Sequence, residues 1–281
     1  MIGSGSAAFE KAIAANGTRN PRRSWPPALL VGASLVLVTF LALPLGVLLL
    51  RAVQPGAVSS LALPAAVEAL RLTVGTTAIS VALIVVFGTP LAYLLARYED
   101  FRGRWLVDAI VDLPMVLPPV VAGVALLLVF GRRGLIGAPL ADVGVTVVFS
   151  TAAVVLAQVF IASPFYVRAL KVGFASVPRE LEAAALTDGA TRFQAFVRIT
   201  VPIAFPSFVE GVVLSWARAL GEFGATIVFA GSLAGRTQTM PLAIFGALER
   251  NLDAAIALSA VLTAVAAAMF LVVRTVSRGR C

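Results

Sequence analysis

The sequence contains no histidine, and its one cysteine is the terminal Cys281. Without imidazole, the chain lacks the side chain that most often serves as an acid–base group or as a metal ligand at neutral pH. A single thiol also excludes an intrachain disulfide and a metal site built from several cysteines. We therefore predict a protein with no metal site and no cofactor of its own.

Charged residues are scarce as well, at 13% of the 281 residues, whereas hydrophobic residues make up 60%. A soluble domain carries about 25% charged and 45–50% apolar residues. The composition therefore predicts an integral membrane protein in contact with lipid. Its apolar runs are continuous and not alternating, which favours helices over a barrel. The net charge of +8 then indicates basic cytoplasmic loops, with no nucleic acid partner.

Six apolar runs approach or exceed the roughly 20 residues that a helix needs to cross a bilayer. We therefore predict an all-α polytopic membrane protein with six transmembrane helices. The third run contains Pro114, Pro118, Pro119 and Gly123, and proline breaks or kinks a helix because it lacks a backbone donor. Such a break is tolerated where protein or a cavity covers it. The six runs lie near residues 28–50, 69–96, 106–130, 146–170, 203–230 and 252–274.

Basic residues fall unevenly between these runs. With the N-terminus inside the cell, fifteen Lys and Arg residues lie on the cytoplasmic side and six on the external side. The positive-inside rule favours this orientation, which places both termini in the cytoplasm. Residues 1–27 are then a cytoplasmic tail, residues 28–64 the first helix with an external loop, and residues 276–281 a second cytoplasmic tail.

A polar stretch, "RELEAAALTDGATRFQAFVRITVP" at 179–202, separates the fourth and fifth runs. Glu180 and Glu182 lie in the first turn of a helix that follows Pro178, where the helix dipole favours acidic side chains. Gly189 is a place for that helix to end or bend. Two interpretations stay open from the residues alone: a docking site for a cytoplasmic partner, and an amphipathic helix that lies on the lipid headgroups.

This stretch resembles the EAA loop of permease subunits of binding-protein-dependent ABC importers. The family pattern is Glu-Ala-Ala, three residues, Gly, nine residues, Ile, one residue and Leu-Pro. Gly189, Ile199 and Pro202 keep that spacing, whereas Glu182 comes one residue before the family's Glu position, which Ala183 holds. The resemblance implies a type I ABC importer fold whose cytoplasmic coupling helix contacts an ATPase subunit. The implied contact residues are Glu182, Ala183, Ala184, Ala185, Gly189, Ala190, Phe193, Ile199 and Pro202.

Three further stretches, at 88–104, 112–134 and 217–245, resemble molybdate permeases, and the similarity covers residues 65–275 as one transmembrane permease domain. The segments "GEFGAT" and "GRTQTMPLAI" are the parts most specific to molybdate permeases. The resemblance implies molybdate as substrate in a bacterial or archaeal cell membrane, with sulfate or tungstate as the alternative. It also implies an external oxyanion-binding protein and two ATPase subunits that hold ATP and magnesium. Two ATPase clefts need two coupling loops, so we expect a homodimer.

Two of the three ionisable residues in the fifth run, Arg218 and Glu222, lie in its second half. Four residues apart, they share a helix face and can pair. Ionisable groups within a span normally face a bundle interior or a cavity, which indicates a pathway or gate; a purely structural pair at a helix contact is the alternative. The candidate residues of this pathway or gate are Arg218, Gly221, Glu222, Gly224, Thr226, Pro118 and Pro119.

Two other classes of function fit the sequence less well. A stand-alone secondary anion transporter often carries internal repeats, and no convincing repeat is present. A membrane enzyme needs a catalytic motif, and the chain lacks Ser-x-x-Lys, a metal-binding histidine and the Walker A pattern, GxxxxGK followed by Ser or Thr. We therefore expect no enzyme activity in this chain and an energy supply from another subunit.

Overall fold

The computed structural model describes residues 27–60, 64–98 and 101–278, and every regular element in these ranges is helical. The predicted all-α class is therefore confirmed. The chain divides into two compact units between Leu49 and Leu50. Within the described residues, the first unit is α2 (Pro27–Ala52) up to Leu49. The predicted N-terminal tail at 1–27 lies almost wholly outside the described residues.

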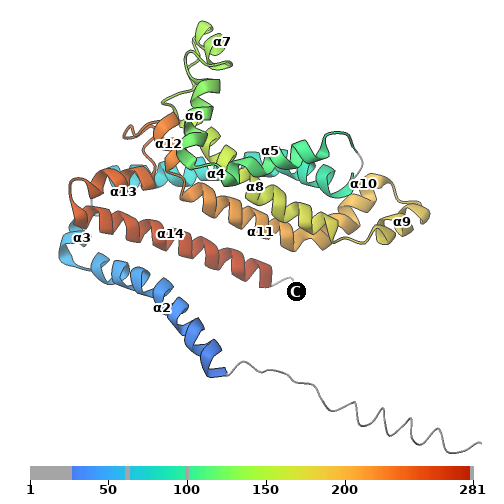
Figure 1. Cartoon of the computed structure of the whole chain (residues 1–281), viewed down its shortest axis with the longest axis horizontal. Helices are drawn as coiled ribbons and strands as arrows, with labels where there is room; N and C mark the ends of the chain where they lie inside the picture. Colours follow the sequence, from blue (N-terminus) through green and yellow to red (C-terminus); the bar gives the residue numbers. More distant parts are fainter. Residues whose placement is uncertain (1–26, 61–63, 99–100, 279–281) are drawn as a thin grey trace, which may run out of the picture. The chain divides into compact units, whose positions relative to one another are not determined.

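The second unit is a bundle of helices of very different lengths (Figure 1). Its helices are α3 (Pro55–Ser60), α4 (Pro64–Arg97), α5 (Arg104–Val116), α6 (Pro119–Phe130), α7 (Gly137–Asp142), α8 (Thr151–Ala175), α9 (Arg179–Thr187), α10 (Arg192–Ala195), α11 (Val201–Leu220), α12 (Gly224–Phe229), α13 (Met240–Leu248) and α14 (Leu252–Arg278). A π-helical turn, Phe196–Thr200, joins α10 to α11.

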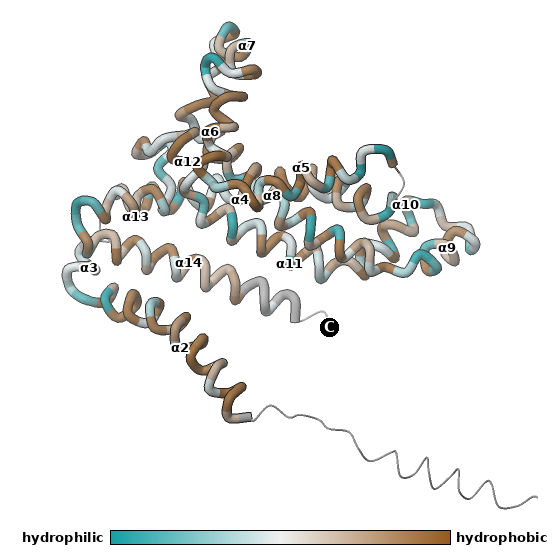
Figure 2. Tube along the Cα trace, viewed as in Figure 1, coloured by the Kyte–Doolittle hydropathy of each residue, from teal (hydrophilic) through white to brown (hydrophobic). Residues whose placement is uncertain are grey.

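Five helical stretches in the described residues are long and apolar enough to cross a membrane, and the pair α5–α6 passes the same test as one broken span. The prediction of six spans is thus met by five continuous stretches and one broken pair. Figure 2 shows hydrophobic residues along the helices and hydrophilic residues gathered at α9 and at several helix ends. The five stretches are Ala28–Ala52, Pro64–Arg97, Thr151–Ala175, Arg192–Leu220 and Leu252–Leu271.

The predicted third span is two helices that meet at 120°. Leu117 and Pro118 both have extended backbone, with ψ at 134°, and α6 begins at Pro119. Two consecutive prolines supply no backbone N–H, and each disfavours helical backbone at the residue before it. The break that the prolines predict is therefore confirmed.

The predicted fifth span is also interrupted, which the sequence analysis missed. Helix α11 ends at Leu220, and the short helix α12 begins only at Gly224. Between them, Glu222 turns its carboxylate onto the next helix, where Oε1 accepts a hydrogen bond from the Ala225 N–H at 2.7 Å. Two glycines and a side chain that satisfies a backbone donor favour a break here. The expectation that Arg218 and Glu222 lie on one continuous helix is therefore wrong.

Helices α4, α8 and α11 pack side by side as the centre of the second unit (Figure 1). Tyr166 on α8 is fully buried between two glycines. A Cβ at Gly88 on α4 would lie 2.9 Å from the Tyr166 ring, and a Cβ at Gly211 on α11 would lie 3.1 Å from its other edge. Small residues let helices approach closely in membranes, so these glycines make room for the aromatic ring.

A row of buried polar side chains also joins α4 to α8. The Ser80 hydroxyl donates to Oε1 of Gln158 at 2.8 Å, and Nε2 of Gln158 donates to the Thr76 hydroxyl at 3.3 Å. The Tyr166 and Thr89 hydroxyls share a hydrogen bond at 2.6 Å. Because buried polar groups destabilise a fold unless they are paired, this complete set of partners specifies how α4 sits on α8.

Candidate functional site

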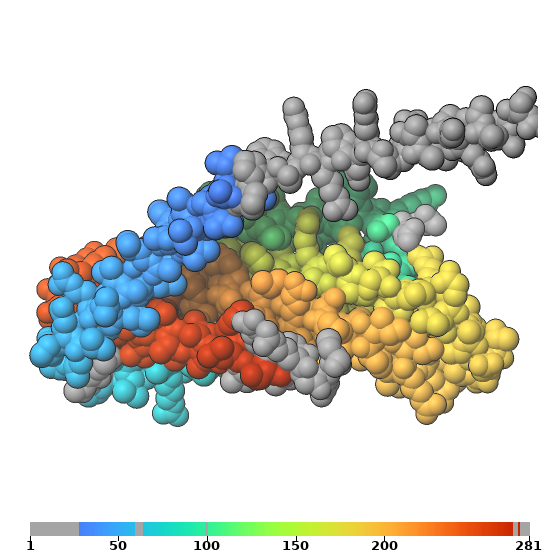
Figure 3. All heavy atoms as spheres, turned by 90° about the horizontal axis from the view of Figure 1, so that it is seen from below, coloured from blue at the N-terminus to red at the C-terminus, as the bar shows by residue number. Residues whose placement is uncertain are grey.

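The predicted coupling segment, 179–202, lies at one end of the second unit (Figure 1). In the space-filling view, the yellow to light orange residues around 175–200 form a protruding end of that unit (Figure 3). The segment consists of α9, a turn, α10 and the π-helical turn that leads into α11. No residue of α9 is buried. A helix that projects with all its residues at least partly accessible is suited to docking.

The turn of the coupling segment is a Schellman motif centred on Gly189. The Ala190 N–H donates to the Ala185 carbonyl at 2.9 Å, and the Gly189 N–H donates to the Leu186 carbonyl at 3.1 Å. Gly189 has φ +90°, and a Cβ there would meet nothing within 4 Å. Glycine is therefore favoured at this position by its left-handed backbone and not by a lack of space.

Helix α10 begins at once after this turn with a capping box. The Gln194 N–H donates to the Thr191 hydroxyl at 3.2 Å, and the Thr191 N–H donates to Oε1 of Gln194 at 2.8 Å. The two reciprocal bonds satisfy backbone donors at the start of the helix. The coupling segment is thus a compact helix–turn–helix whose turn is stabilised by hydrogen bonds among its own residues.

The exposed surface of the coupling segment combines apolar side chains with charged ones, which are Arg179, Glu180, Asp188, Arg192 and Arg198. Phe193 is 75% exposed, and Leu186 is 42% exposed. Of the predicted contact residues, Ala183, Ala184, Gly189, Phe193 and Pro202 are exposed, whereas Ala185, Ala190 and Ile199 are half-buried. The exposed predicted contact residues therefore form small apolar patches between charged side chains, a mixture that is common at protein interfaces.

Glu182 differs from the other predicted contact residues because it is turned inward. Its Oε1 accepts hydrogen bonds from Nη2 of Arg97, at 2.7 Å, and from the Thr200 hydroxyl. Arg97 is the last residue of α4, 85 positions earlier in the chain. No spacing pattern links residues so far apart, which is why sequence reasoning missed Arg97.

The two helix breaks of the second unit lie against each other. A Cβ at Gly224, the first residue of α12, would lie 2.7 Å from Cβ of Pro119, the first residue of α6. A Cβ at Gly123 would lie 2.9 Å from the Ala225 carbonyl oxygen. The structure therefore brings predicted pathway residues from the third and fifth runs together, with glycines allowing the close approach.

The predicted ion pair lies at this junction. Nη1 of Arg218 is 2.9 Å from Oε2 of Glu222, without the geometry of a hydrogen bond. Glu222 is 1% exposed, whereas the Arg218 side chain is 28% exposed. Thr226 is also buried, and within the described residues its hydroxyl has no hydrogen-bond partner. Pro118, Pro119 and Gly221 are exposed in this single chain.

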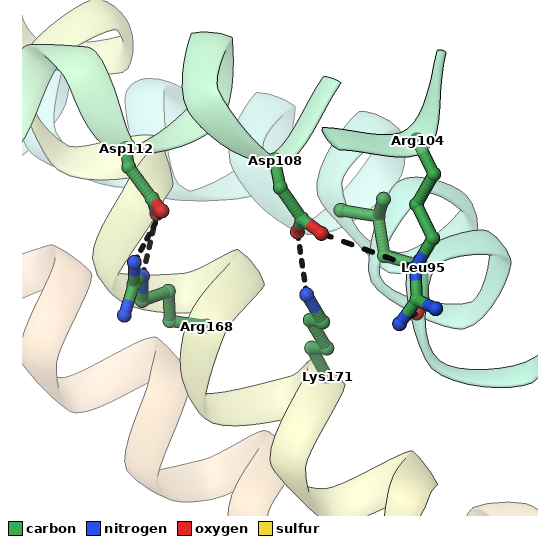
Figure 4. A network of polar contacts seen from close by, with 6 residues as sticks. All are labelled: Leu95, Arg104, Asp108, Asp112, Arg168 and Lys171. Carbon is green, nitrogen blue, oxygen red and sulfur yellow. Dashed lines mark hydrogen bonds and ion pairs between the residues drawn. The ribbon is translucent and has the colours of Figure 1, made fainter. Parts of the chain in front are cut away.

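A second set of ion pairs ties α5 to α8 (Figure 4). Nζ of Lys171 lies 2.5 Å from Oδ1 of Asp108, and Nε of Arg168 donates to Oδ1 of Asp112 at 2.5 Å. Both pairs are partly exposed, so each contributes modestly to stability.

Known relatives share most of this chain. Residues 88–279 match the family described as binding-protein-dependent transport system inner membrane component. The molybdenum transport system permease protein ModB of Mycobacterium tuberculosis is 44% identical over 236 residues, which cover 83% of this chain and 88% of the relative. ModB of Escherichia coli is 42% identical over 183 residues, covering 65% and 80%. The probable sulfate transport system permease protein cysT of Nephroselmis olivacea is 37% identical over 235 residues, covering 83% and 81%.

Solved structures with the same fold are more distant in sequence. A bacterial ABC transporter involved in the import of the acidic polysaccharide alginate has a TM-score of 0.71 at 20% identity, covering 89% of this chain and 94% of that chain. The MetNI methionine ABC transporter has a TM-score of 0.60 at 20% identity, covering 76% and 95%. These likenesses concern the fold and confirm the predicted type I ABC importer permease architecture. From the family match and the apolar helices together, the chain is a multi-pass membrane protein that belongs to the binding-protein-dependent transport system inner membrane component family.

Proposed function

We propose that this chain is the permease subunit of an ATP-driven ABC importer for molybdate. The observation that carries the proposal is the coupling segment, a projecting helix–turn–helix whose exposed residues include Ala183, Ala184 and Phe193. In this proposal the segment seats in a cleft of an ATPase subunit. The names of the relatives at 42–44% identity support molybdate as the substrate.

The proposal assigns ATP hydrolysis to other chains. Two ATPase subunits bind ATP and magnesium, and this chain binds no cofactor and is not itself an enzyme. Because each copy carries one coupling segment, two copies form a homodimer around the pathway, which satisfies both ATPase clefts. An external oxyanion-binding protein delivers the substrate, which the description of the matched family supports.

Orientation follows from the same proposal, with the coupling segment and both termini in the cytoplasm. The excess of basic residues on that side supports it. After replacement of Cys281, a cysteine at exposed Thr187 should react with a membrane-impermeant maleimide only in opened vesicles. A cysteine at exposed Ala234 should react in intact right-side-out vesicles. The reverse labelling pattern would invert the proposed topology.

The junction of the two helix breaks is the proposed gate of the pathway. Arg218 is partly exposed and has Glu222 as its ion-pair partner, so its charge is neutralised while the junction is closed. When the angle between α11 and α12 changes, Arg218 leaves its ion pair with Glu222 and pairs with a passing oxyanion instead. Because binding in a pathway must be weak enough for release, a shared arginine suits transit better than a dedicated anion site.

Substrate choice is tested with the reconstituted complex of this chain, its ATPase and its binding protein. Uptake of labelled molybdate is measured while unlabelled molybdate, tungstate or sulfate compete at equal concentration. We expect molybdate to compete best and sulfate to compete at least tenfold less well. A stronger effect of sulfate would favour the alternative substrate that the 37% identical sulfate relative suggests.

A further inference from the structure

Arg97, at the end of α4, makes two hydrogen bonds at the start of the coupling segment. Its Nη1 donates to the Val177 carbonyl oxygen at 3.1 Å, just before α9, and its Nη2 donates to Glu182 at 2.7 Å. The same oxygen of Glu182 accepts a hydrogen bond from Thr200, the last residue before α11. These four residues, Arg97, Val177, Glu182 and Thr200, are called the arginine clamp below.

The arginine clamp is shielded from water. The Arg97 side chain is 7% exposed and the Glu182 side chain 22% exposed. Behind them, the rings of Tyr93, Phe174 and Phe196 pack edge-on or tilted, with centroids 5.0, 5.4 and 6.1 Å apart. Salt screens a partly buried ion pair less than an exposed one, so the clamp fixes the geometry of the segment more firmly than a surface pair.

Glu182, a member of the arginine clamp, is the one acidic residue among the ATPase contact residues that the family resemblance implies. The neighbouring residues Ala183 and Ala184 point outward, as does Phe193 on α10. Glu182 therefore has its partners within this chain, and the exposed face of the segment is formed by other residues. Docking and transmission of movement are thus assigned to different side chains of one short segment.

We propose that Arg97 is a positioning residue of the transport cycle. Through the arginine clamp, displacement of the coupling segment by an ATPase carries α4 along directly and carries α11 along through Thr200. Without the clamp, α9 pivots about the left-handed turn at Gly189, and the displacement is absorbed there. This inference rests on the proposed coupling role of the segment, and it assigns Glu182 to transmission within the chain.

The test compares variants in the reconstituted complex with its ATPase and binding protein. The variants are Arg97→Gln, Glu182→Gln, Thr200→Val and the charge swap Arg97→Glu with Glu182→Arg. Arg102→Gln is the matched control, because Arg102 is an exposed arginine just before α5. Phe193→Ala is the comparison for the outward face. Three quantities are measured for each: ATPase subunit bound per permease, ATP hydrolysed, and molybdate taken up per ATP.

We expect Arg97→Gln and Glu182→Gln to bind the ATPase within twofold of the native chain while uptake per ATP falls at least tenfold. Thr200→Val, which keeps the ion pair, should lower uptake per ATP about threefold. The charge swap should recover a substantial part of the loss, and Arg102→Gln should match the native chain. Phe193→Ala should instead lose ATPase binding.

Two results would overturn the inference. One is uptake per ATP at the native value in both Arg97→Gln and Thr200→Val. The other is a loss of ATPase binding in Glu182→Gln as large as in Phe193→Ala, which would return Glu182 to the docking face. If Arg97→Gln fails to insert into the membrane, uptake per ATP in Thr200→Val and in the charge swap tests the inference without it. Full ATPase binding in Phe193→Ala would count against the proposed docking face. The uptake per ATP of the clamp variants would still test the role of Arg97.

Discussion

Glycines allow close packing in two regions of the second unit, the centre and the junction of the helix breaks. The helices are continuous in the centre and interrupted at the junction. At the centre, Gly88 and Gly211 let α4 and α11 close around the ring of Tyr166. At the junction, Gly123 and Gly224 bring α6 and α12 together where two helices have just been interrupted. Glycine therefore allows close approach both between continuous helices and between interrupted ones.

The difference lies in the polar groups. In the centre, Ser80, Gln158 and Tyr166 all have hydrogen-bond partners. At the junction, Oε2 of Glu222 has only its ion pair with Arg218, and the hydroxyl of Thr226 is buried without a hydrogen-bond partner within the described residues. A satisfied network favours one arrangement, whereas unsatisfied buried groups cost free energy that a rearrangement can recover. We therefore expect the centre to move as one body and the junction to change shape.

The largest expected effect concerns the ion pair at the junction. Arg218→Leu leaves the carboxylate of Glu222, 1% exposed, without its counter-charge. Breaking a buried pair from one side costs about 3–5 kcal/mol, so we expect the melting temperature of the purified complex to fall steeply. Glu222→Leu should cost less, because Arg218 is 28% exposed. The double variant should recover assembly.

Uptake by that double variant separates a gate from a structural pair. If the pair is a gate, the assembled double variant transports poorly or leaks molybdate without ATP. Full uptake with full ATP dependence in the double variant would mean that the junction, like the centre, only holds helices together.

The second prediction tests the packing of the centre. In Gly88→Leu, the new side chain begins 2.9 Å from the Tyr166 ring, so overpacking should cost about 1–3 kcal/mol or more. Gly75→Leu is the matched control on the same helix, since a Cβ there meets nothing within 4 Å. The melting temperatures of both variants in detergent check this. Equal melting temperatures of the two variants would show that the close contact between Gly88 and Tyr166 does not limit stability.

The third prediction contrasts a glycine needed for space with a glycine needed for backbone. Gly189 has open space around it but φ +90°, so Gly189→Val should cost about 1–2 kcal/mol of local strain. Gly189→Asn should be tolerated better, because asparagine adopts the left-handed region more readily. ATPase binding and uptake should fail in the valine variant and largely persist in the asparagine variant. The reverse order would exclude the backbone explanation.

The smallest expected effect compares single hydroxyl groups. Ser80→Ala removes a donor from buried Gln158 and should cost about 1 kcal/mol. Thr226→Val removes a buried hydroxyl that has no hydrogen-bond partner within the described residues, and should leave stability unchanged or raised. Thermal unfolding of the two purified variants measures the difference. A greater loss in Thr226→Val would show that its hydroxyl is already satisfied.

Local features of the fold follow from the sequence. The apolar runs predict the long helices, the consecutive prolines at 118 and 119 predict the first break, and Gly189 predicts the turn of the coupling segment. Each depends on residues close together in the chain. The end of α11 at Leu220 was missed because apolar residues flank the break on both sides, and hydropathy gives no sign that the Glu222 carboxylate turns onto the next helix.

Contacts between distant residues could not be predicted in the same way. Arg97 and Glu182 are 85 positions apart, and Gly88 meets Tyr166 only after α4 and α8 have packed. One sequence carries no signal for such pairs, since each partner alone is compatible with a solvated or lipid-facing position. The direction of Glu182, inward and away from the exposed face, is the consequence that matters most for function.

Molybdate uptake into proteoliposomes, with and without the ATPase subunit, tests the central claim most directly. We expect uptake to require the ATPase, hydrolysable ATP and the binding protein together, and to be lost in Gly189→Val while the variant chain still inserts. Uptake by this chain alone, driven by a proton or sodium gradient and unaffected by ATP, would contradict the account and make the chain a secondary transporter.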